Sequence, residues 1–268
     1  MPGRLLPLLR VASVAAWRLG GLCPEAVLYL QMHDEDPGWG GLRFDAKADD
    51  RSALLPDPYA LGSEGYRLFR EQLERQPLPP WRERLPRAFW RGASTGTKAI
   101  TVQRLPMNRR YQLCQHTLRW SQWLDARFTR VVQCRDAAAE QSVLAHLCDR
   151  QLIAPASEPW HFGLHRFLIE IDGNVNSWGL LWKLLSGSCV LRVDSARRQW
   201  YHPLLQPYRH IVPIAADLSD LPDRLAWCFD NVDACEAIAA QGRNLALQVV
   251  QGLGRSVLRA LDETGAHR

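Results

Sequence analysis

The sequence contains no CxxC pair, and its histidines and cysteines do not recur at the spacing of a metal site. Its seven cysteines are spread evenly along 268 residues. An odd and scattered set of thiols in a chain of this size is typical of a protein kept in a reducing compartment. We therefore expect free thiols and no disulfide framework, and the thiol pattern favours a cytoplasmic location.

Long apolar runs are also absent. At the N-terminus Arg4, Arg10 and Arg18 interrupt each apolar stretch, so this segment is too short and broken to span a bilayer and makes a poor signal peptide. The same stretch is basic and amphipathic, which leaves open a peripheral contact with the inner face of the cytoplasmic membrane.

No basic block dominates the charge. The net charge is +5, and arginines gather only in pairs, at Arg109-Arg110 and Arg197-Arg198. This distribution predicts a weak preference for anionic ligands and argues against a nucleic-acid partner. Eleven tryptophans are unusual. Such rings often line sugar or nucleotide sites, although plain core packing is the simpler explanation for most of them.

Strand and helix patterns alternate along most of the chain. A strand is expected at 26–32 and a helix at 63–76, and the proline-rich segment 76–86 is typical of a linker. The expected later strands are 87–91, 128–133, 166–171, 188–193 and 210–214. The expected later helices are 108–124, 137–151, 177–186, 221–230 and 232–251. Leu144 and Leu147 should face the core. This alternation predicts an α/β fold, with a parallel sheet covered by helices on both faces.

A polar turn follows the expected strand 166–171, at the position where ligands gather in such sheets. Five of its residues suit a diphosphate: Asp172, Gly173, Asn174, Asn176 and Ser177. Ser177 is a good N-cap for the next helix, whose free N–H groups would face the ligand. The asparagines add side-chain donors, and Gly173 allows close approach of the backbone. An ordinary capped turn is the alternative.

A second polar turn ends the expected strand 87–91. Arg91 could fork onto phosphate oxygens, with Ser94 and Thr95 donating nearby and Gly92 between them. A salt bridge at the surface is the alternative role for Arg91. Two such turns on neighbouring strands of one sheet would form a cleft. Each turn therefore supports a ligand-binding role for the other.

Three segments together resemble glycosyltransferase family 90, the CAP10-like group. This group includes protein O-glucosyltransferases, fungal capsule xylosyltransferases and bacterial lipopolysaccharide-modifying enzymes. The segments are FWRGASTG, RFLIEIDGNVNSWGLLWKLLSGSCVLRV and QWYHPLLQPYRHIVPIAADLSDL, in the family's order and spacing. The resemblance runs from about residue 25 to about residue 250 and is dense between 88 and 245.

The resemblance implies a GT-B-like architecture, in which two Rossmann-like domains face each other across a cleft. Here a reduced acceptor-side domain would occupy 1–85 and a nucleotide-sugar-binding domain 86–268, with the C-terminal helices able to pack back on the first part. Members transfer a sugar from a nucleotide diphosphate, usually UDP, with inversion. Basic side chains and helix dipoles stabilise the leaving diphosphate in place of a metal, so no metal and no cofactor are expected. The expected acceptor is a surface glycan or glycolipid such as lipopolysaccharide.

The resemblance also suggests roles for individual residues. The family's catalytic carboxylate base falls on Asp34, with Glu35 and Asp36 within a register slip, while three solvated acids in a turn are the alternative. Asp57 either orients the acceptor or caps a turn, and the cap is favoured.

The two donor-side turns match the family's pattern with one departure. Several relatives carry an arginine suited to the diphosphate where this chain has Gly179, and the nearest cation in that helix is Lys183. Arg91 and the helix terminus then become the expected phosphate-binding groups. In the third segment Trp200 and Tyr201 could stack on the donor, although core packing is favoured.

Two further classes of function stay open beside an active transferase. Gly179 and the short N-terminal part would fit a nucleotide-sugar-binding or glycan-binding relative that has lost turnover. The many tryptophans would fit a scaffold subunit of a glycan-assembly complex, with rings anchoring an interface.

Overall fold

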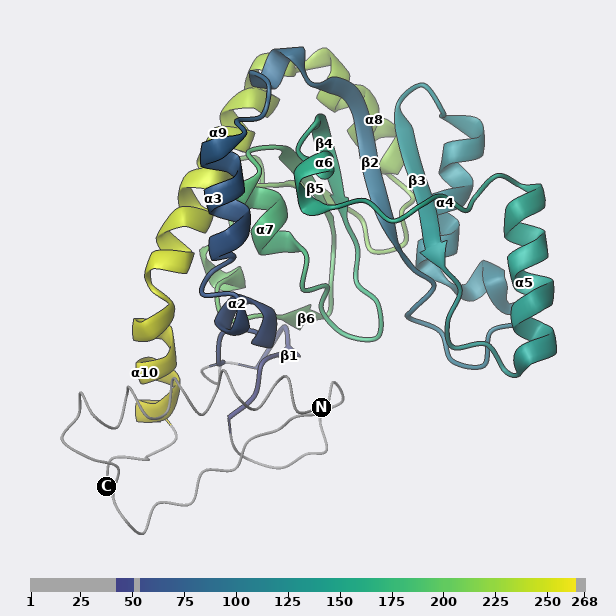
Figure 1. Ribbon diagram of the computed structural model, residues 1–268, viewed down its shortest axis with the longest axis horizontal. Coiled ribbons are helices and arrows are strands. Elements are labelled where there is room, and N and C mark those ends of the chain that lie inside the picture. The colour runs from purple at the N-terminus through teal and green to yellow at the C-terminus, as the bar shows by residue number, and fades with distance from the viewer. Residues whose placement is uncertain (1–41, 51–53, 264–268) are drawn as a thin grey trace, which may run out of the picture.

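The computed structural model describes residues 42–50 and 54–263 (Figure 1). The expected strand at 26–32, and the candidate base Asp34 with Glu35 and Asp36, lie outside these residues.

Five parallel strands form the central sheet: β2 (Leu85–Ala93), β3 (Leu124–Arg130), β4 (His165–Glu170), β5 (Cys189–Val193) and β7 (Val212–Ile214). Their order is β3-β2-β4-β5-β7. Residues of β4 and β5 are almost all buried, as expected for strands covered on both faces. The prediction of an α/β fold with a parallel sheet is therefore confirmed.

Side chains of each strand alternate between two apolar cores, because successive residues point to opposite faces. Trp90 and Ile169 belong to one core, with α4 (Arg109–Arg119), α5 (Ala137–Asp149) and α8 (Leu221–Asp230). Phe89 and Leu168 belong to the other, with α3 (Arg67–Arg75), α6 (Pro159–Phe162) and α7 (Leu180–Leu185). The long helix α9 (Val232–Gln251) contributes to both. Figure 1 shows α3, α7 and α9 on one side of the sheet and α4 and α5 towards the other.

The described residues before β2 pack on the C-terminal helices. Leu42, Phe44 and Leu55 form a small core with α10 (Leu253–Glu263), which also includes Leu61 of α2 (Pro58–Gly62). The short strand β1 (Ala46–Lys47) pairs antiparallel with β6 (Arg197–Arg198). Three 3₁₀ helices complete the described elements: η1 (Trp81–Glu83), η2 (Val102–Met107) and η3 (His202–Leu204). The proposed domain division at 85/86 stays a prediction.

Three expected helices have different bounds. The helix expected at 63–76 is α3, which begins only at Arg67, because Glu64, Gly65 and Tyr66 have positive φ values of 51°, 69° and 57°. The helix expected at 108–124 is α4, which ends at Arg119. The helix expected from Ser177 begins only at Leu180, and its N-cap residue is Gly179, which makes no side-chain cap bond. Ser177 is therefore not the N-cap that its sequence position predicted.

Three smaller expectations also need correction. The strand expected at 128–133 is β3 at Leu124–Arg130, because the charged Asp125 is buried there against Arg91. On α5 Leu147 is fully buried as expected, but Leu144 is 42% exposed. The linker expected at 76–86 contains η1, whose Trp81 is buried, and its last residues already belong to β2.

The strand order creates a crevice at one place. From β2 the chain moves to β3 on one side and then returns to β4 on the other side of β2. The connections that leave β2 and β4 therefore run in opposite directions. In open α/β sheets, ligands bind at such a point, outside the carboxyl ends of the two strands.

Candidate functional site

A pocket of about 460 Å³ lies at the carboxyl ends of β2 and β4, where the two connections diverge. This volume is within the usual range for small-molecule sites. The pocket, called the donor crevice below, is bordered by the turn after β2 and by the segment 173–179 after β4. It is also lined by Tyr59, Tyr66, Arg110, Arg130 and Trp182.

The two turns predicted from the sequence meet in this crevice. The backbone N–H of Gly96 donates to Asn174 Oδ1 at 3.0 Å. A Cβ at Gly173 would lie 2.5 Å from Thr95 Oγ1, so only glycine allows this approach. At Gly96, with a φ of +108°, a Cβ would lie 3.2 Å from the Gly173 carbonyl oxygen. Both glycines are thus needed to hold the turns together.

The Arg110 side chain connects the two turns by hydrogen bonds. Its guanidinium donates to Ala93 O at 3.0 Å and Thr95 Oγ1 at 2.7 Å on one side, and to Ile171 O at 3.1 Å and Asp172 O at 3.0 Å on the other. A guanidinium has five N–H donors, so one on Nη2 is left over. Burial lowers the pKa of Arg110, while the charges of nearby carboxylates oppose the shift. Arg110 therefore places a buried positive charge at the wall of the crevice.

The sequence reasoning missed the role of Arg110, although its signal was visible. Arg110 lies in the first turn of α4, directly after Asn108, the N-cap residue, whose Oδ1 accepts the N–H of Tyr111 at 3.0 Å. Asn108 Nδ2 also donates to Ser94 O at 3.0 Å, which holds the start of α4 under the turn after β2. The Arg109-Arg110 pair at the start of an expected helix was the available sign.

The Asp172 carboxylate braces the second turn. Its Oδ1 accepts the backbone N–H of Ser177 at 2.9 Å, and its Oδ2 accepts the hydroxyl of Ser195. The Ser177 hydroxyl accepts the N–H of Gly179 at 3.3 Å, and the Ser177 carbonyl accepts from Gln199 at 2.8 Å. Asp172 thus shapes the crevice through its backbone and side-chain bonds, without lining it.

Asn176 is buried and lines the crevice. Its Nδ2 donates to Asp45 Oδ2 at 3.3 Å, while its Oδ1 has no partner among the residues that the structure describes. An unsatisfied buried acceptor costs free energy unless a ligand or water donates to it. This oxygen suits a hydroxyl of a bound sugar.

The two cations expected to hold the diphosphate do not line the crevice. Arg91 forms two 2.9 Å bonds with the carboxylate of Asp125, and both side chains are more than nine-tenths buried. Lys183 donates to Glu170 Oε2 at 2.5 Å and to Ile169 O at 2.9 Å. Lys183 nevertheless lies directly under the crevice, because a Cβ at Gly179 would be 3.4 Å from its Nζ. Arg110 is instead the arginine that both lines the crevice and contacts its two turns.

Two other predicted residues of the first turn are structural. The Ser94 hydroxyl is fully buried, donates to Val132 O at 2.9 Å and accepts the Val132 N–H at 2.8 Å, which ties the ends of two neighbouring strands. Gly92 makes room for the Trp90 ring, since a Cβ there would lie 2.6 Å from it. Of the predicted residues in this turn, Thr95 lines the crevice.

Aromatic side chains form part of the crevice lining together with Arg110. They are Tyr59, Tyr66, Trp178 and Trp182. The Tyr66 hydroxyl donates to Trp178 O at 3.2 Å, and burial raises the pKa of Tyr66 well above its ordinary value. A lining that combines aromatic rings with a buried guanidinium suits a ligand with one flat or apolar part and one anionic part.

Asp57 caps a helix, as the sequence favoured. Its Oδ1 accepts the N–H groups of Tyr59 at 2.8 Å and Ala60 at 2.9 Å at the start of α2. The carboxylate is 1% exposed, and Oδ2 has no partner within the described part of the chain. Burial raises the pKa of Asp57 to about 7, against the opposing effect of the two backbone bonds.

Some features are absent from the described residues. No group of three or more histidine, cysteine, aspartate or glutamate side chains gathers there in a form that could hold a metal ion. The six described cysteines are all unpaired. Within residues 42–50 and 54–263 no helix combines the length and apolar character needed to cross a membrane.

The model of Glycosyl transferase family 90 matches residues 62–252, which include both turns of the crevice. This match covers most of the chain, so the protein belongs to glycosyltransferase family 90. Asp34 lies outside the matched residues.

Three relatives are identical to this chain at about a quarter of the aligned residues. Protein O-glucosyltransferase 3 of Homo sapiens is 26% identical over 173 residues, which are 65% of this chain and 30% of the human protein. Protein O-glucosyltransferase 1 of Bos taurus is 25% identical over 193 residues, 70% of this chain and 44% of the bovine protein. Uncharacterized protein 179R of Invertebrate iridescent virus 6 is 26% identical over 191 residues, 60% of this chain and 15% of the viral protein. The chain thus spans less than half the length of these relatives.

Solved structures that align with part of this chain include Anabaena Alr3699/HepE in complex with UDP-glucose. It aligns with a TM-score of 0.46 and 11% identity, over 75% of this chain and 52% of that chain. The pneumococcal O-GlcNAc transferase GtfA in complex with UDP and GlcNAc aligns with a TM-score of 0.39 and 10% identity, over 84% and 51% of the two chains.

Proposed function

We propose that the protein is a glycosyltransferase that takes a sugar from a UDP-sugar, inverts its anomeric carbon and transfers it without a metal to a surface glycan or glycolipid such as lipopolysaccharide. The observation that carries the proposal is the donor crevice, where Arg110 joins both polar turns at the point where the connections diverge. Family membership supports the transfer of a sugar, and the crevice supports a donor with an anionic group.

The residues of the crevice fit the parts of such a donor. The remaining Nη2 donor of Arg110 would bind a phosphate oxygen and offset negative charge as the diphosphate leaves. The Asn176 Oδ1 acceptor would take a hydroxyl of the sugar or ribose. Tyr59 or Trp182 in the lining would cover the flat base or the sugar ring.

Inversion requires one carboxylate that removes the acceptor's proton while its oxygen attacks the anomeric carbon from the side opposite the diphosphate. We assign this role to Asp34, with Glu35 and Asp36 as its neighbours in the same acidic turn. A GT-B-like arrangement with a reduced acceptor-side domain would bring that turn across from the crevice. A cytoplasmic enzyme working at the inner face of the membrane would meet a glycolipid acceptor there.

The first test is titration calorimetry of the full chain against UDP, with and without EDTA. We expect micromolar binding that EDTA does not change. Arg110→Lys keeps the charge but loses the fork geometry, so UDP affinity should fall by about tenfold or more. Arg109→Lys is the matched control, because Arg109 is the exposed neighbour on the same helix and does not line the crevice.

Thermal unfolding of both variants shows whether the fold survives, and Thr95→Val, which removes one Arg110 partner, gives a milder second probe. Absence of UDP binding to the wild-type chain would rule out the donor site and favour a scaffold subunit. UDP binding that is intact, with no transfer and no effect of Asp34→Asn, would favour a binding relative that has lost turnover.

A further inference from the structure

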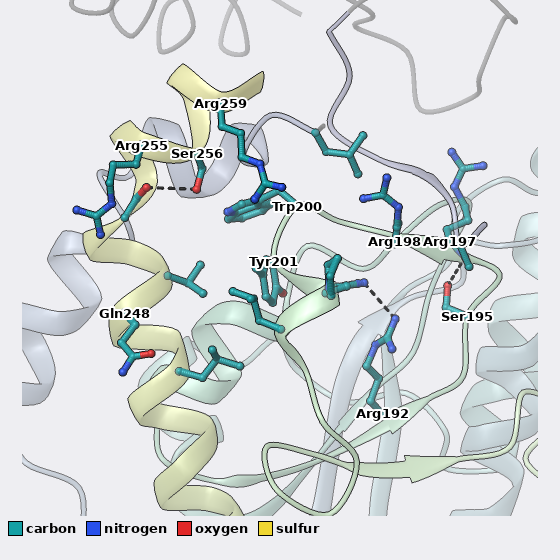
Figure 2. Close-up of a pocket in the computed structure, with 18 of the residues that line it drawn as sticks. Arg192, Ser195, Arg197, Arg198, Trp200, Tyr201, Gln248, Arg255, Ser256 and Arg259 are labelled. Carbon is teal, nitrogen blue, oxygen red and sulfur yellow. Dashed lines mark hydrogen bonds between the residues drawn. The ribbon is translucent and has the colours of Figure 1, made fainter. Parts of the chain in front are cut away.

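A second and larger pocket lies outside the donor crevice (Figure 2). Its volume is about 660 Å³, and it is bordered by β6, the segment 200–204, α9 and α10. None of the described residues lines both pockets. We call it the arginine pocket, because five of its lining residues are arginines: Arg192, Arg197, Arg198, Arg255 and Arg259.

Among the described residues, carboxylates pair with some arginines of the pocket but not with Arg192 or Arg255. Arg197 pairs with Asp45, and Arg198 Nε donates to Asp50 O. Arg192 and Arg255 have no carboxylate within ion-pair distance in the described part of the chain. The Arg259 side chain is 81% exposed and forms a 3.5 Å ion pair with Glu263. Among the residues that the structure describes, the lining includes two carboxylates, Asp194 and Glu263. Figure 2 shows the arginines entering from different elements, Arg255 and Arg259 from α10 and Arg192 from β5.

Three consecutive residues of the lining each carry a buried polar atom without a partner among the described residues. These atoms are Trp200 Nε1, Tyr201 Oη and His202 Nε2. Tyr201 is 1% exposed, so its hydroxyl has no access to bulk water. Buried polar groups in folded proteins normally have a partner, and three adjacent exceptions in one pocket indicate a ligand site.

All three atoms can donate a hydrogen bond. Tryptophan Nε1 is a donor only, and a tyrosine hydroxyl donates readily. His202 Nδ1 lies 3.2 Å from Arg192 Nη2, and because a guanidinium cannot accept, Nδ1 must be the acceptor of that bond. Burial and the charges of Arg192 and Arg198 lower the pKa of His202 well below its ordinary value, so the ring is neutral and its proton sits on Nε2. The pocket thus offers three donors beside several guanidinium groups.

A lining in which arginines and unpartnered donors outnumber the carboxylates among the described residues suits an oxyanion. A phosphoryl group has three terminal oxygens and up to two negative charges, which matches guanidinium forks combined with several single donors. Apolar side chains such as Pro203, Leu204 and Leu245 form the rest of the lining and would pack against the molecule that carries the group.

We propose that the arginine pocket binds a phosphoryl group, carried either by a phosphorylated sugar or by a phospholipid head group. Hydrogen bonds connect residues around the arginine pocket with residues around the donor crevice. Ser195, in its lining, bonds Asp172 of the crevice turn, and Gln199 Nε2 donates to Ser177 O at 2.8 Å. If the proposed transferase function holds, a phosphorylated glycan or glycolipid bound here is the acceptor.

Titration calorimetry with glucose 6-phosphate tests the first source. Flotation with phosphatidylcholine vesicles, with and without phosphatidic acid, tests the second. Tyr201→Phe removes only the unpartnered hydroxyl, so stability should hold or rise while affinity for the phosphoryl ligand falls severalfold. Arg255→Gln combined with Arg259→Gln should lower that affinity by about tenfold or more.

Arg75→Gln combined with Arg150→Gln removes the same charge from exposed sites outside both pockets, and this control should bind like the wild-type chain. Arg110→Lys should leave binding of the phosphoryl ligand to the arginine pocket intact, and the Arg255/Arg259 variant should keep UDP binding at the donor crevice. The two proposals can therefore be refuted separately. Binding of neither source to the wild-type chain, or equal loss in the control and the test variants, would overturn the proposal.

Discussion

Arg91 and Asp125 form a buried two-pronged ion pair, with Nη1 2.9 Å from Oδ1 and Nη2 2.9 Å from Oδ2. Burial by itself would raise the pKa of Asp125, but the hydrogen bonds and charge of Arg91, with smaller effects of Arg127 and Arg87, outweigh it and lower the pKa. An arginine that matches a family motif thus holds two strands together instead of facing the crevice.

Arg91→Ala should therefore act on stability more than on donor binding. Removing one partner of a buried pair leaves the other charge without compensation, which costs about 3–5 kcal/mol. Arg87→Ala is the control, because Arg87 meets the same carboxylate at 3.2 Å but is 40% exposed, so its loss should cost less than about 1 kcal/mol. Urea denaturation measures both. A large loss of UDP affinity in a folded Arg91→Ala protein would show that this arginine reaches the donor.

Gly173→Ala should disturb the crevice directly. The new methyl group would lie 2.5 Å from Thr95 Oγ1 and 3.1 Å from Arg110 Nη2, so it would push these groups apart. We expect UDP affinity to fall by about tenfold or more, with a stability loss of about 1–3 kcal/mol. Gly254→Ala is the comparison, since nothing lies within 4 Å of its Cβ position and α10 should gain up to about 1 kcal/mol. Unchanged UDP binding in Gly173→Ala would remove this turn from the donor site.

Asp57 should make stability depend on pH. Its pKa is about 7 in the folded chain, against an ordinary value of 3.8. Between these values the folded state holds a proton that the unfolded state has released, so this group's contribution to stability falls as pH rises from 4 to 7 and is constant above.

Asp57→Asn keeps the cap oxygen without the charge, so it should be more stable than wild type at pH 8, by more than about 1 kcal/mol, and similar near pH 4. Asp57→Ala loses the cap and should be less stable than Asp57→Asn by about 1 kcal/mol at either pH. Denaturant titrations at the two pH values measure this. A difference between Asp57→Asn and wild type that does not vary with pH would contradict the raised pKa.

The proposed base gives a kinetic prediction. Asp34→Asn should lower the transfer rate by about 10²–10⁴-fold, because proton removal from the acceptor is lost, while UDP affinity stays unchanged. Glu35→Gln and Asp36→Asn serve as matched controls, and the largest loss identifies the base. Transfer to an added glycan measured from a UDP-sugar provides the readout. Equal and small effects in all three would place the base elsewhere.

The sequence by itself determined the class of fold and the location of the site along the chain. Apolar runs such as 166–171, bounded by polar turns and helical patterns, allow only buried parallel strands, because both faces must be covered. The glycine, asparagine and hydroxyl residues after two of these strands marked the segments that meet in the crevice, because residues that follow parallel strands collect at one edge of the sheet.

Tertiary structure decided which side chains face that crevice. Arg91 and Lys183 carry the right charge, but neighbouring carboxylates, Asp125 and Glu170, bind them in the interior. Arg110 comes from a helix and reaches both turns only because β2 and β4 are adjacent in the sheet. Spacing along the chain specifies local conformation, whereas the choice among several arginines depends on contacts between distant segments, which form only in the folded molecule.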